Sequence, residues 1–535
     1  MAGGATGECV LGLDIGTTGA RAVAFDLAGR QLYAAAADYP LHAPHPGWAE
    51  QDAEQVCGAA TACLREVADR ARRERCHAAA LGLSAILHSL IPVDAAGHAL
   101  GPAIIWADGR STAEADEIRA EVDALALYHR VGGPVHPMYS PPKLRWLRRH
   151  RPDVFAAAAA FVGIKEYVLR RWTGLHLCDR SIASGTGLYD LRAASWDGEA
   201  LALAGLTAER LPPLVEPAAP LPVPAARRRA LGLPDDCVVV AGAGDGVLQT
   251  IGTGCVAPGQ MVAMVATSGA IRAVVDEVRT DPQARTWCYY LGAGRWVAGA
   301  AINNAGLVFV WLRDQLQAAA RDVEARGKRQ EARKRQTSGG NEAAEAIEIE
   351  VEDLNRWAGE VPAGSNGLLF LPYLAGERSP NWNANARGLL FGLSLAHDYR
   401  HLARATLEGV AYRMRTIFEP MEEVAGAATE IRAAGGFTRS PLWLQIVADV
   451  LGRPLVLADS PEASALGAAQ LAMLGAGIAA RFEDLAALAR TGATVLPDHG
   501  RHALYGRLYE RYQRIYDLVR NEFAAIAHLQ AELAT

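Results

Sequence analysis

A single aspartate stands between an apolar run and a glycine-bracketed turn near the start of the chain. The stretch VLGLDIGTTGARAVAFD covers residues 10–26, with Asp14 at the end of the first run and Thr17, Thr18 and Gly19 in the turn. Because this turn has no bulky side chain, its backbone N–H groups and hydroxyls can approach a phosphate closely. The Lys-Ser/Thr ending of a Walker A loop is absent, and the following residues alternate like a strand. A phosphate-binding hairpin is therefore favoured, with Asp14 placed to hold Mg²⁺ directly or through water; an ordinary hairpin is the alternative.

A second aspartate has glycine on both sides. In AGAGDG the apolar strand predicted from residue 238 ends, and Asp245 follows among small neighbours that leave its carboxylate accessible. The ends of strands are where α/β proteins usually place their sites. A carboxylate there could accept the proton of a substrate hydroxyl during phosphoryl transfer. Gly-Asp-Gly is also common in plain turns, so this motif alone leaves both interpretations open.

The opening stretch has an echo about 250 residues later. TSGAIRAVVD, which contains Thr267, Ser268 and Gly269, shares T-[TS]-G-A, an arginine and an Ala-Val pair with TTGARAVAFD. Either chance produced this match, or each half of the chain is built on a similar strand–turn–strand unit.

A third glycine turn precedes a helix start. In IRAAGGFTRSPLW a strand leads to Gly435 and Gly436, and Ser440 and Pro441 then form a good N-cap and first helical position. Glycine at this turn would let a flat group such as adenine or ribose lie against the backbone. A tight strand–helix turn without a ligand is the alternative.

Several polar and aromatic residues lie in three further stretches, SAILHSL, IIWADGRST and PVHPMYSPPKLRWL. They are His88, Trp106, Asp108, Arg110, His136 and Lys143. Such a mixture suits a polyol, because polar groups bind hydroxyls and an aromatic ring can cover a carbon face. Taken singly, each of them is more often structural.

The elements that must position these residues alternate between strand and helix. Apolar runs predict strands, and residues at helical spacing predict a helix over 51–73. A charged segment at 318–351 without aromatics indicates an insertion, and residues 502–533 favour one long amphipathic helix. The strands are predicted at 10–13, 21–25, 79–83, 90–93, 238–242 and 262–266.

Length and composition narrow the class of protein. A chain of 535 residues predicts at least two domains, and a net charge of −6 gives no field for nucleic acid or an anionic membrane. The eight cysteines are dispersed without CxxC pairs, which fits free thiols in a reducing cytosol. The first residues are not typical of a secretory signal, and no apolar run is long enough to cross a bilayer. We therefore expect a cytoplasmic α/β enzyme.

Taken together, these motifs resemble the FGGY carbohydrate kinase family of the sugar kinase, Hsp70 and actin superfamily. The resemblance also rests on LLFLPYLAGERSPNWNANARG, LEGVAYRMR and EASALGAA, and it covers roughly residues 8–480 in order. It implies an α/β fold of two ribonuclease-H-like domains with a cleft between them. The expected domains are 1–254, which binds sugar, and 255–535, which binds nucleotide.

The resemblance also implies roles for individual residues. Asp14 would serve Mg²⁺, and Asp245 would be the catalytic base that contacts the substrate. The cofactor ATP would be bound by three glycine turns, and the sugar hydroxyls by side chains of the first domain. The turns supply Thr17, Thr18, Gly19, Thr267, Ser268, Gly269, Gly435 and Gly436; the sugar-binding side chains are His88, Trp106, Asp108 and Arg110.

Within the family, the chain is most similar to kinases that act on gluconate. Gluconate requires a cation for its carboxylate, and we expect Lys165 or Arg272 over Arg110 and Lys143. A xylulose-type or other polyol kinase is one alternative, and a non-catalytic actin-like nucleotide-binding module is another. The expected partners are a sugar or sugar acid and ATP, without nucleic acid or membrane, and a homodimer remains open.

Overall fold

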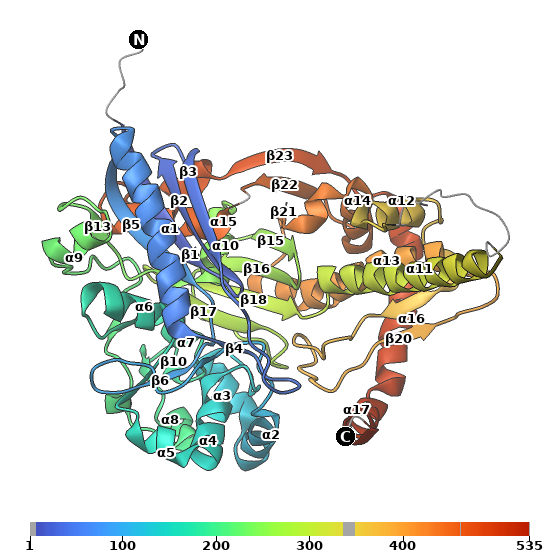
Figure 1. Ribbon diagram of the computed structural model, residues 1–535, viewed down its shortest axis with the longest axis horizontal. Coiled ribbons are helices and arrows are strands. Elements are labelled where there is room, and N and C mark those ends of the chain that lie inside the picture. Colours follow the sequence, from blue (N-terminus) through green and yellow to red (C-terminus); the bar gives the residue numbers. More distant parts are fainter. Residues whose placement is uncertain (1–6, 335–347, 461, 534–535) are drawn as a thin grey trace, which may run out of the picture.

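The protein has two α/β halves, each built on one mixed β-sheet (Figure 1). The computed structural model describes residues 7–334, 348–460 and 462–533. Across the first sheet the strands are β3 (Gln31–Asp38), β2 (Gly19–Asp26), β1 (Glu8–Ile15), β5 (His77–Ala85) and β13 (Val238–Val239), with β14 (Ala243–Gly244) also paired to β5. Across the second they are β17 (Trp287–Gly292), β18 (Arg295–Ile302), β16 (Gly269–Val275), β15 (Gln260–Val265), β21 (Glu430–Ala434), β22 (Leu455–Asp459) and β23 (Arg490–Val495).

The two sheets repeat one pattern of strand pairing. In the first, β1 pairs antiparallel with β2 and parallel with β5, while β2 continues antiparallel to β3 and β5 parallel to β13. In the second, β15 pairs antiparallel with β16 and parallel with β21, while β16 continues antiparallel to β18 and β21 parallel to β22. The hairpins β1–β2 and β15–β16 are therefore equivalent. The sequence echo belongs to a repeated structural unit, as the duplication interpretation predicts.

One long helix packs on the equivalent pair of antiparallel strands in each half. Helix α1 (Ala53–Arg73) packs on β2 and β3, and α13 (Tyr399–Ala425) packs on β16 and β18. The apolar residues of α1 recur at helical spacing and are buried, which explains why this segment folds as an amphipathic helix. The side chain of Asp52 accepts hydrogen bonds from two backbone N–H groups of the first turn. This cap starts the helix two residues later than predicted.

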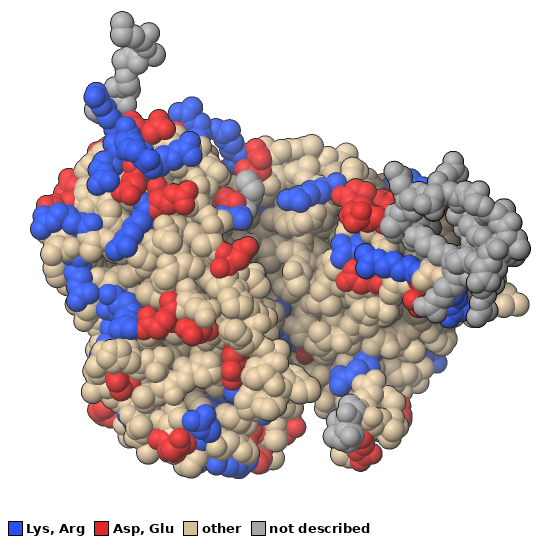
Figure 2. All heavy atoms as spheres, in the orientation of Figure 1, with Lys and Arg blue, Asp and Glu red and all other residues tan. Residues whose placement is uncertain are grey.

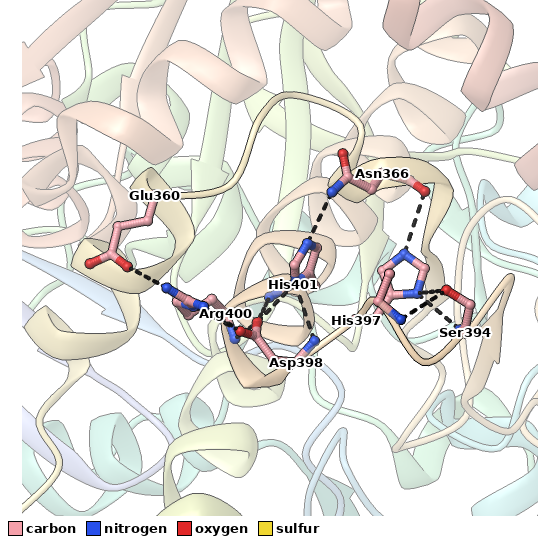
Figure 3. Close-up of polar contacts among 8 residues, drawn as sticks. Glu360, Asn366, Ser394, His397, Asp398, Arg400 and His401 are labelled. Atoms are coloured by element: carbon pink, nitrogen blue, oxygen red, sulfur yellow. Dashed lines mark hydrogen bonds and ion pairs between the residues drawn. The ribbon is translucent and has the colours of Figure 1, made fainter.

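A polar network fixes the start of α13 (Figure 3). The Asp398 carboxylate accepts hydrogen bonds from the backbone N–H of Arg400 at 3.0 Å and from the ring of His401 at 2.8 Å. The Arg400 guanidinium also bonds the Asp398 carboxylate and reaches Glu360 at 3.3 Å. Unpaired N–H groups at a helix start are thereby satisfied. The network therefore stabilises the first turn of α13.

Glycines allow helix α15 (Ala463–Gly475) to lie directly on the first sheet and on α10 (Asp245–Gly252). A Cβ atom built on Gly12 of β1 would stand 1.9 Å from the carbonyl oxygen of Ala465, and one on Gly467 would stand 2.0 Å from that of Leu248. No side chain fits such gaps, so backbone packs against backbone. A helix late in the sequence thus completes the core of the first half.

The segment between β5 and β13 in the sequence forms short elements, most of which make a smaller lobe at the lower left of Figure 1. Its strand β6 (Ile91–Val93) agrees with the prediction over 90–93. Its helices are α2 (Thr112–Glu121), α3 (Ala124–Val131), α4 (Ser140–His150), α5 (Pro152–Ala157), α6 (Ile164–Thr173), α7 (Arg180–Ser184), α8 (Gly198–Ala204) and α9 (Ala225–Ala230).

Two predicted segments differ from the structure. The chain end forms α16 (His499–Val519) and α17 (Glu522–Leu533) where one helix was predicted, because the break lets Phe523 pack on Tyr373 and Tyr516. The beginning of the predicted insertion continues α11 (Gly306–Lys334). Residues 335–347 of the insertion lie outside the described residues, and α12 (Val351–Gly359) follows.

The cysteines, the surface charges and the lengths of the helices can each be compared with the predictions made from composition. The eight cysteines are all free, and every one except Cys76 is buried. Lys and Arg side chains alternate with Asp and Glu on the face shown in Figure 2. Within the described ranges, none of the helices combines the length and apolar character needed to cross a membrane.

Candidate active site

The first predicted phosphate turn lies where β1 passes into β2. Asp14 is the penultimate residue of β1, and its carboxylate accepts a hydrogen bond of 2.6 Å from the Ser84 hydroxyl. Burial, opposed by the Ser84 hydrogen bond and aided by the nearby carboxylates of Asp245 and Glu462, raises the pKa of Asp14 to about 7. Asp14, Thr18, Gly19 and Glu462 line a pocket of about 290 Å³, which we call the hairpin pocket. Arg21 pairs with Glu462 at 2.7 Å in this pocket, so Asp14 is the buried carboxylate there that a bound cation would stabilise.

The backbone of this turn is held from several sides. The Gln51 amide donates to the carbonyl of Thr17 at 2.6 Å, and the Tyr39 hydroxyl donates to that of Gly16 at 2.7 Å. The indole N–H of Trp106 donates to the Thr17 hydroxyl at 3.0 Å. A predicted sugar-binding residue and a predicted phosphate-binding residue are therefore in direct contact.

A second pocket lies between the two halves of the chain. It has a volume of about 470 Å³, and we call it the interdomain pocket. Trp106, Asp108 and Arg110 line it from the first half, and Thr267 and Ser268 line it from the β15–β16 turn of the second half. Candidates separated by more than 150 residues in sequence thus face one cavity, where a sugar and a phosphate donor could meet.

Asp245 begins helix α10, directly after β14. Its carboxylate accepts a hydrogen bond of 2.7 Å from the N–H of Gly246. Burial raises the pKa of Asp245, while the charges of Arg272 and Arg378 oppose that rise. A carboxyl group with a raised pKa is a better proton acceptor than a solvated one, which suits a general base.

His88 is held in a strained backbone conformation three residues after β5, the strand that pairs with β14. Its φ is 66°, in the left-handed region, and its Nδ1 lies 2.6 Å from the carbonyl oxygen of Gly185. The rings of Tyr139 and Tyr289 meet the imidazole edge-on, with centroids 5.0 and 5.8 Å away. Burial and then the charge of Lys143 hold the pKa of His88 well below its usual value. His88 is therefore a neutral hydrogen-bonding group.

The Gly435–Gly436 turn follows β21 at the edge where β15 also ends. Gly435 has a φ of 99°, and a Cβ atom built there would stand 2.5 Å from the carbonyl oxygen of Val265. Both glycines are exposed, and Gly436 has open space around it. The Ser440 hydroxyl caps α14 (Pro441–Leu451) as predicted, accepting from the N–H of Trp443 at 3.2 Å.

The two halves each match one domain of a known family. Residues 9–252 match the N-terminal domain of the FGGY family of carbohydrate kinases, and residues 252–476 match its C-terminal domain. The chain belongs to this family. The FGGY kinase fold explains the two equivalent sheets and the pocket between the halves, and it confirms the predicted two-domain α/β architecture.

Individual relatives of this FGGY kinase match along nearly the whole chain. The gluconokinase of Bacillus subtilis (strain 168) is 34% identical over 530 residues, 98% of this chain and 99% of that protein. The xylulose kinase of Escherichia coli (strain K12) is 29% identical over 514 residues, 95% and 98% of the two chains. The crystal structure of gluconate kinase from Lactobacillus acidophilus superimposes with a TM-score of 0.86 at 29% identity, covering 97% and 99%.

Three of the predicted sugar-binding residues are already engaged by protein groups. Lys165 is buried, pairs with Asp179, and donates to the carbonyl oxygen of Ala241 at 2.9 Å. Asp108 accepts from the backbone N–H of Ala49 at 2.6 Å and pairs with Arg110 at 2.7 Å. Asp108 and Arg110 line the interdomain pocket, whereas Lys165 lines neither pocket of this FGGY kinase.

The structure adds a residue to this site that the sequence motifs did not single out. Arg378 lines the interdomain pocket, with its guanidinium carbon 5.1 Å from the centre of the Trp106 ring. Its charge acts on Asp245. Arg378 belongs to the GERSP stretch quoted for the family resemblance, but no spacing or periodicity there indicates that its side chain turns toward Asp245.

Proposed function

We propose that this FGGY kinase transfers the γ-phosphoryl group of ATP to the terminal hydroxyl of D-gluconate, giving 6-phosphogluconate. The observation that carries the proposal is the interdomain pocket, in which Trp106 and the Thr267–Ser268 turn line one cavity and Arg378, also in its wall, acts on the charge of Asp245. Two gluconokinases at 34% and 33% identity over 98% of the chain support gluconate as the acceptor.

In this proposal Asp245 is the general base. Its carboxylate accepts the proton of the attacking hydroxyl while the new oxygen–phosphorus bond forms and the bond to the ADP oxygen breaks. The raised pKa that burial gives Asp245 favours this proton transfer. Trp106 and the neutral His88 orient the sugar, because an aromatic ring covers its carbons and an imidazole bonds a hydroxyl.

The glycine turns would hold the nucleotide. Backbone N–H groups and hydroxyls of Thr17, Thr18 and Gly19 and of the Thr267–Gly269 turn approach the terminal phosphates from opposite halves. The exposed Gly435 and Gly436 leave room for adenosine. Asp14 would hold Mg²⁺, which neutralises phosphate charge when bound; one carboxylate among like charges, with one oxygen bonded by Ser84, fits a cation that keeps most of its waters.

A substrate panel tests the proposal. ADP release is measured with the purified enzyme, ATP and Mg²⁺ against D-gluconate, D-xylulose, glycerol and ribitol. We expect kcat/KM for gluconate to exceed that for each neutral compound by at least about 100-fold. A preference for xylulose or glycerol would assign the enzyme to another substrate class represented among its relatives. Absence of turnover with every acceptor, despite ATP binding, would favour a nucleotide-binding module.

A further inference from the structure

A sugar acid needs a cation that the protein has not already neutralised. Three of the four cations that the sequence offers do not meet this condition. Lys165 pairs with Asp179, and Arg110 pairs with both Asp108 and Glu50. The ammonium group of Lys143 is fully buried and donates to three backbone carbonyls, those of His88, Ile104 and Ile105.

The fourth cation, Arg272, has no acidic partner within ion-pair distance among the described residues. Its Nη1 donates at 2.7 Å to the amide oxygen of Gln249, which is neutral. Arg272 is only 9% exposed, and its Nε is buried without a hydrogen-bond partner in the described part of the chain. An unsatisfied buried guanidinium N–H is costly, so this side chain is poised for an acceptor.

The register of β16 directs Arg272 toward the catalytic aspartate. Ile271 and Ala273 belong to the core beneath α13, and alternation along the strand turns Arg272 to the other face, toward α10. A Cβ atom built on Gly246 would stand 3.2 Å from the Arg272 Nε, so the guanidinium lies beside the start of α10. Arg272 is three residues beyond Gly269, about 10 Å along the strand from the turn assigned to phosphate.

Two arginines act on the carboxylate of Asp245, and they differ in how far acidic neighbours compensate them. Arg272 and Arg378 both act on this one carboxylate, and the Nε of Arg378 also lacks a partner in the described residues. The acidic neighbour of Arg378, Glu377, is paired with Arg413 at 3.2 Å. Glu377 nevertheless acts on Arg378, whereas Asp245 is the carboxylate that acts on Arg272. Arg272 is therefore the less compensated of the two cations, and a substrate carboxylate would complete its compensation.

From this geometry we propose that Arg272 binds the carboxylate of the acceptor and makes the enzyme selective for sugar acids over neutral polyols. This inference rests on the proposed gluconate kinase function and assigns its specificity to one residue. A guanidinium–carboxylate contact is strong in a buried site and has no counterpart with a polyol. Arg378, on the pocket wall beside Trp106, supplies the second positive charge.

The test compares D-gluconate with D-glucitol, in which a neutral CH₂OH replaces the carboxylate. We expect Arg272→Gln to raise KM about 10- to 100-fold more for gluconate than for glucitol, because only gluconate carries the carboxylate. Any loss of kcat that acts through Asp245 is common to both acceptors and cancels in this ratio. The matched control is Arg145→Gln. Arg145 is also 9% exposed but pairs with Glu121 at 2.7 Å, so its substitution should leave the gluconate-to-glucitol ratio unchanged.

A second measurement needs no variant. The neutral D-gluconamide should bind the wild-type enzyme at least about ten-fold more weakly than gluconate, measured by calorimetry. Equal affinity would overturn the inference even if Arg272→Gln failed to fold. An equal loss with both acceptors would also overturn it, because Arg272 would then serve phosphoryl transfer in general. If the wild type turns over gluconate and Arg272→Gln keeps its selectivity, only this inference fails; if the wild type prefers neutral polyols, the proposed function fails with it.

Discussion

Asp245 combines three features that a proton acceptor needs: burial, a position at the start of α10, and two arginines that keep its charged form accessible. Replacing Asp245 by Asn preserves its size but removes the acceptor. We expect kcat to fall about 1000-fold, the usual range for loss of a general base, with ATP affinity by calorimetry within about three-fold of wild type. Turnover within ten-fold of wild type would contradict the base role.

Glu166 allows a test of buried charge away from the hairpin and interdomain pockets. It is 3% exposed on α6, and burial raises its pKa to about 7. Between the ordinary pKa of glutamate and pH 7 the folded protein binds more protons than the unfolded chain, so unfolding free energy falls as pH rises through this window. Above pH 7 the folded state contains a buried carboxylate.

Glu166→Gln removes that charge and can still accept the hydrogen bond from the N–H of Gly163, which is 2.9 Å long. The variant should therefore unfold about 2 °C higher than wild type at pH 8 and at nearly the same temperature at pH 5, by differential scanning calorimetry. A stabilisation that does not change with pH, or a loss of stability at pH 8, would show that the charge is not the cause.

At the scale of elements, the contact between α10 and α15 depends on glycine. A Cβ atom on Gly467 would collide with the backbone of Leu248, so Gly467→Ala should lower the unfolding free energy by about 3 kcal/mol or more in urea titrations. Gly58 is the control, since it lies exposed in α1 with open space around it. Gly58→Ala should stabilise by up to about 1 kcal/mol, and equal effects of the two substitutions would refute the packing argument.

Elements with local signals could be predicted from the sequence. The hairpin β1–β2, helix α1 and the Ser440 cap are set by apolar periodicity and by residues that satisfy nearby N–H groups. The break between α16 and α17 could not, because distant Tyr373 decides where Phe523 packs.

The same distinction holds for the site. The glycines and hydroxyls of the turns are local signals, so the turns could be predicted from the sequence. The ion pair of Lys165 with Asp179 and the direction of the Arg378 side chain could not, because they depend on how separate elements pack. A lysine bound to a buried partner and a lysine available to a ligand look alike in sequence. The ordered set of motifs, more than any single residue, made the family visible.

At the scale of the whole molecule, the halves share their cores. Helix α15 lies on β1 and β5 of the first sheet although it follows nearly the whole second sheet in sequence. A fragment of residues 1–254 would expose the apolar surface that α15 covers, which includes Val10, Val23 and Val240. We expect this fragment to lack a cooperative thermal transition in near-ultraviolet circular dichroism, whereas the full chain unfolds cooperatively. A sharp transition of the isolated fragment would contradict this expectation.

The position of α15 also affects how such enzymes can be recombined. A chimaera joined at residue 252, where the two family domains meet, would pair the first sheet of one parent with the α15 of the other. In these contacts a Cβ atom at the glycine would stand within 2.0 Å of a carbonyl oxygen. The glycines of both parents therefore cannot be replaced by any larger residue. A chimaera that exchanges substrate specificity between relatives must therefore take α15 from the same parent as β1 and β5. The segments that have to be exchanged together are not continuous in sequence.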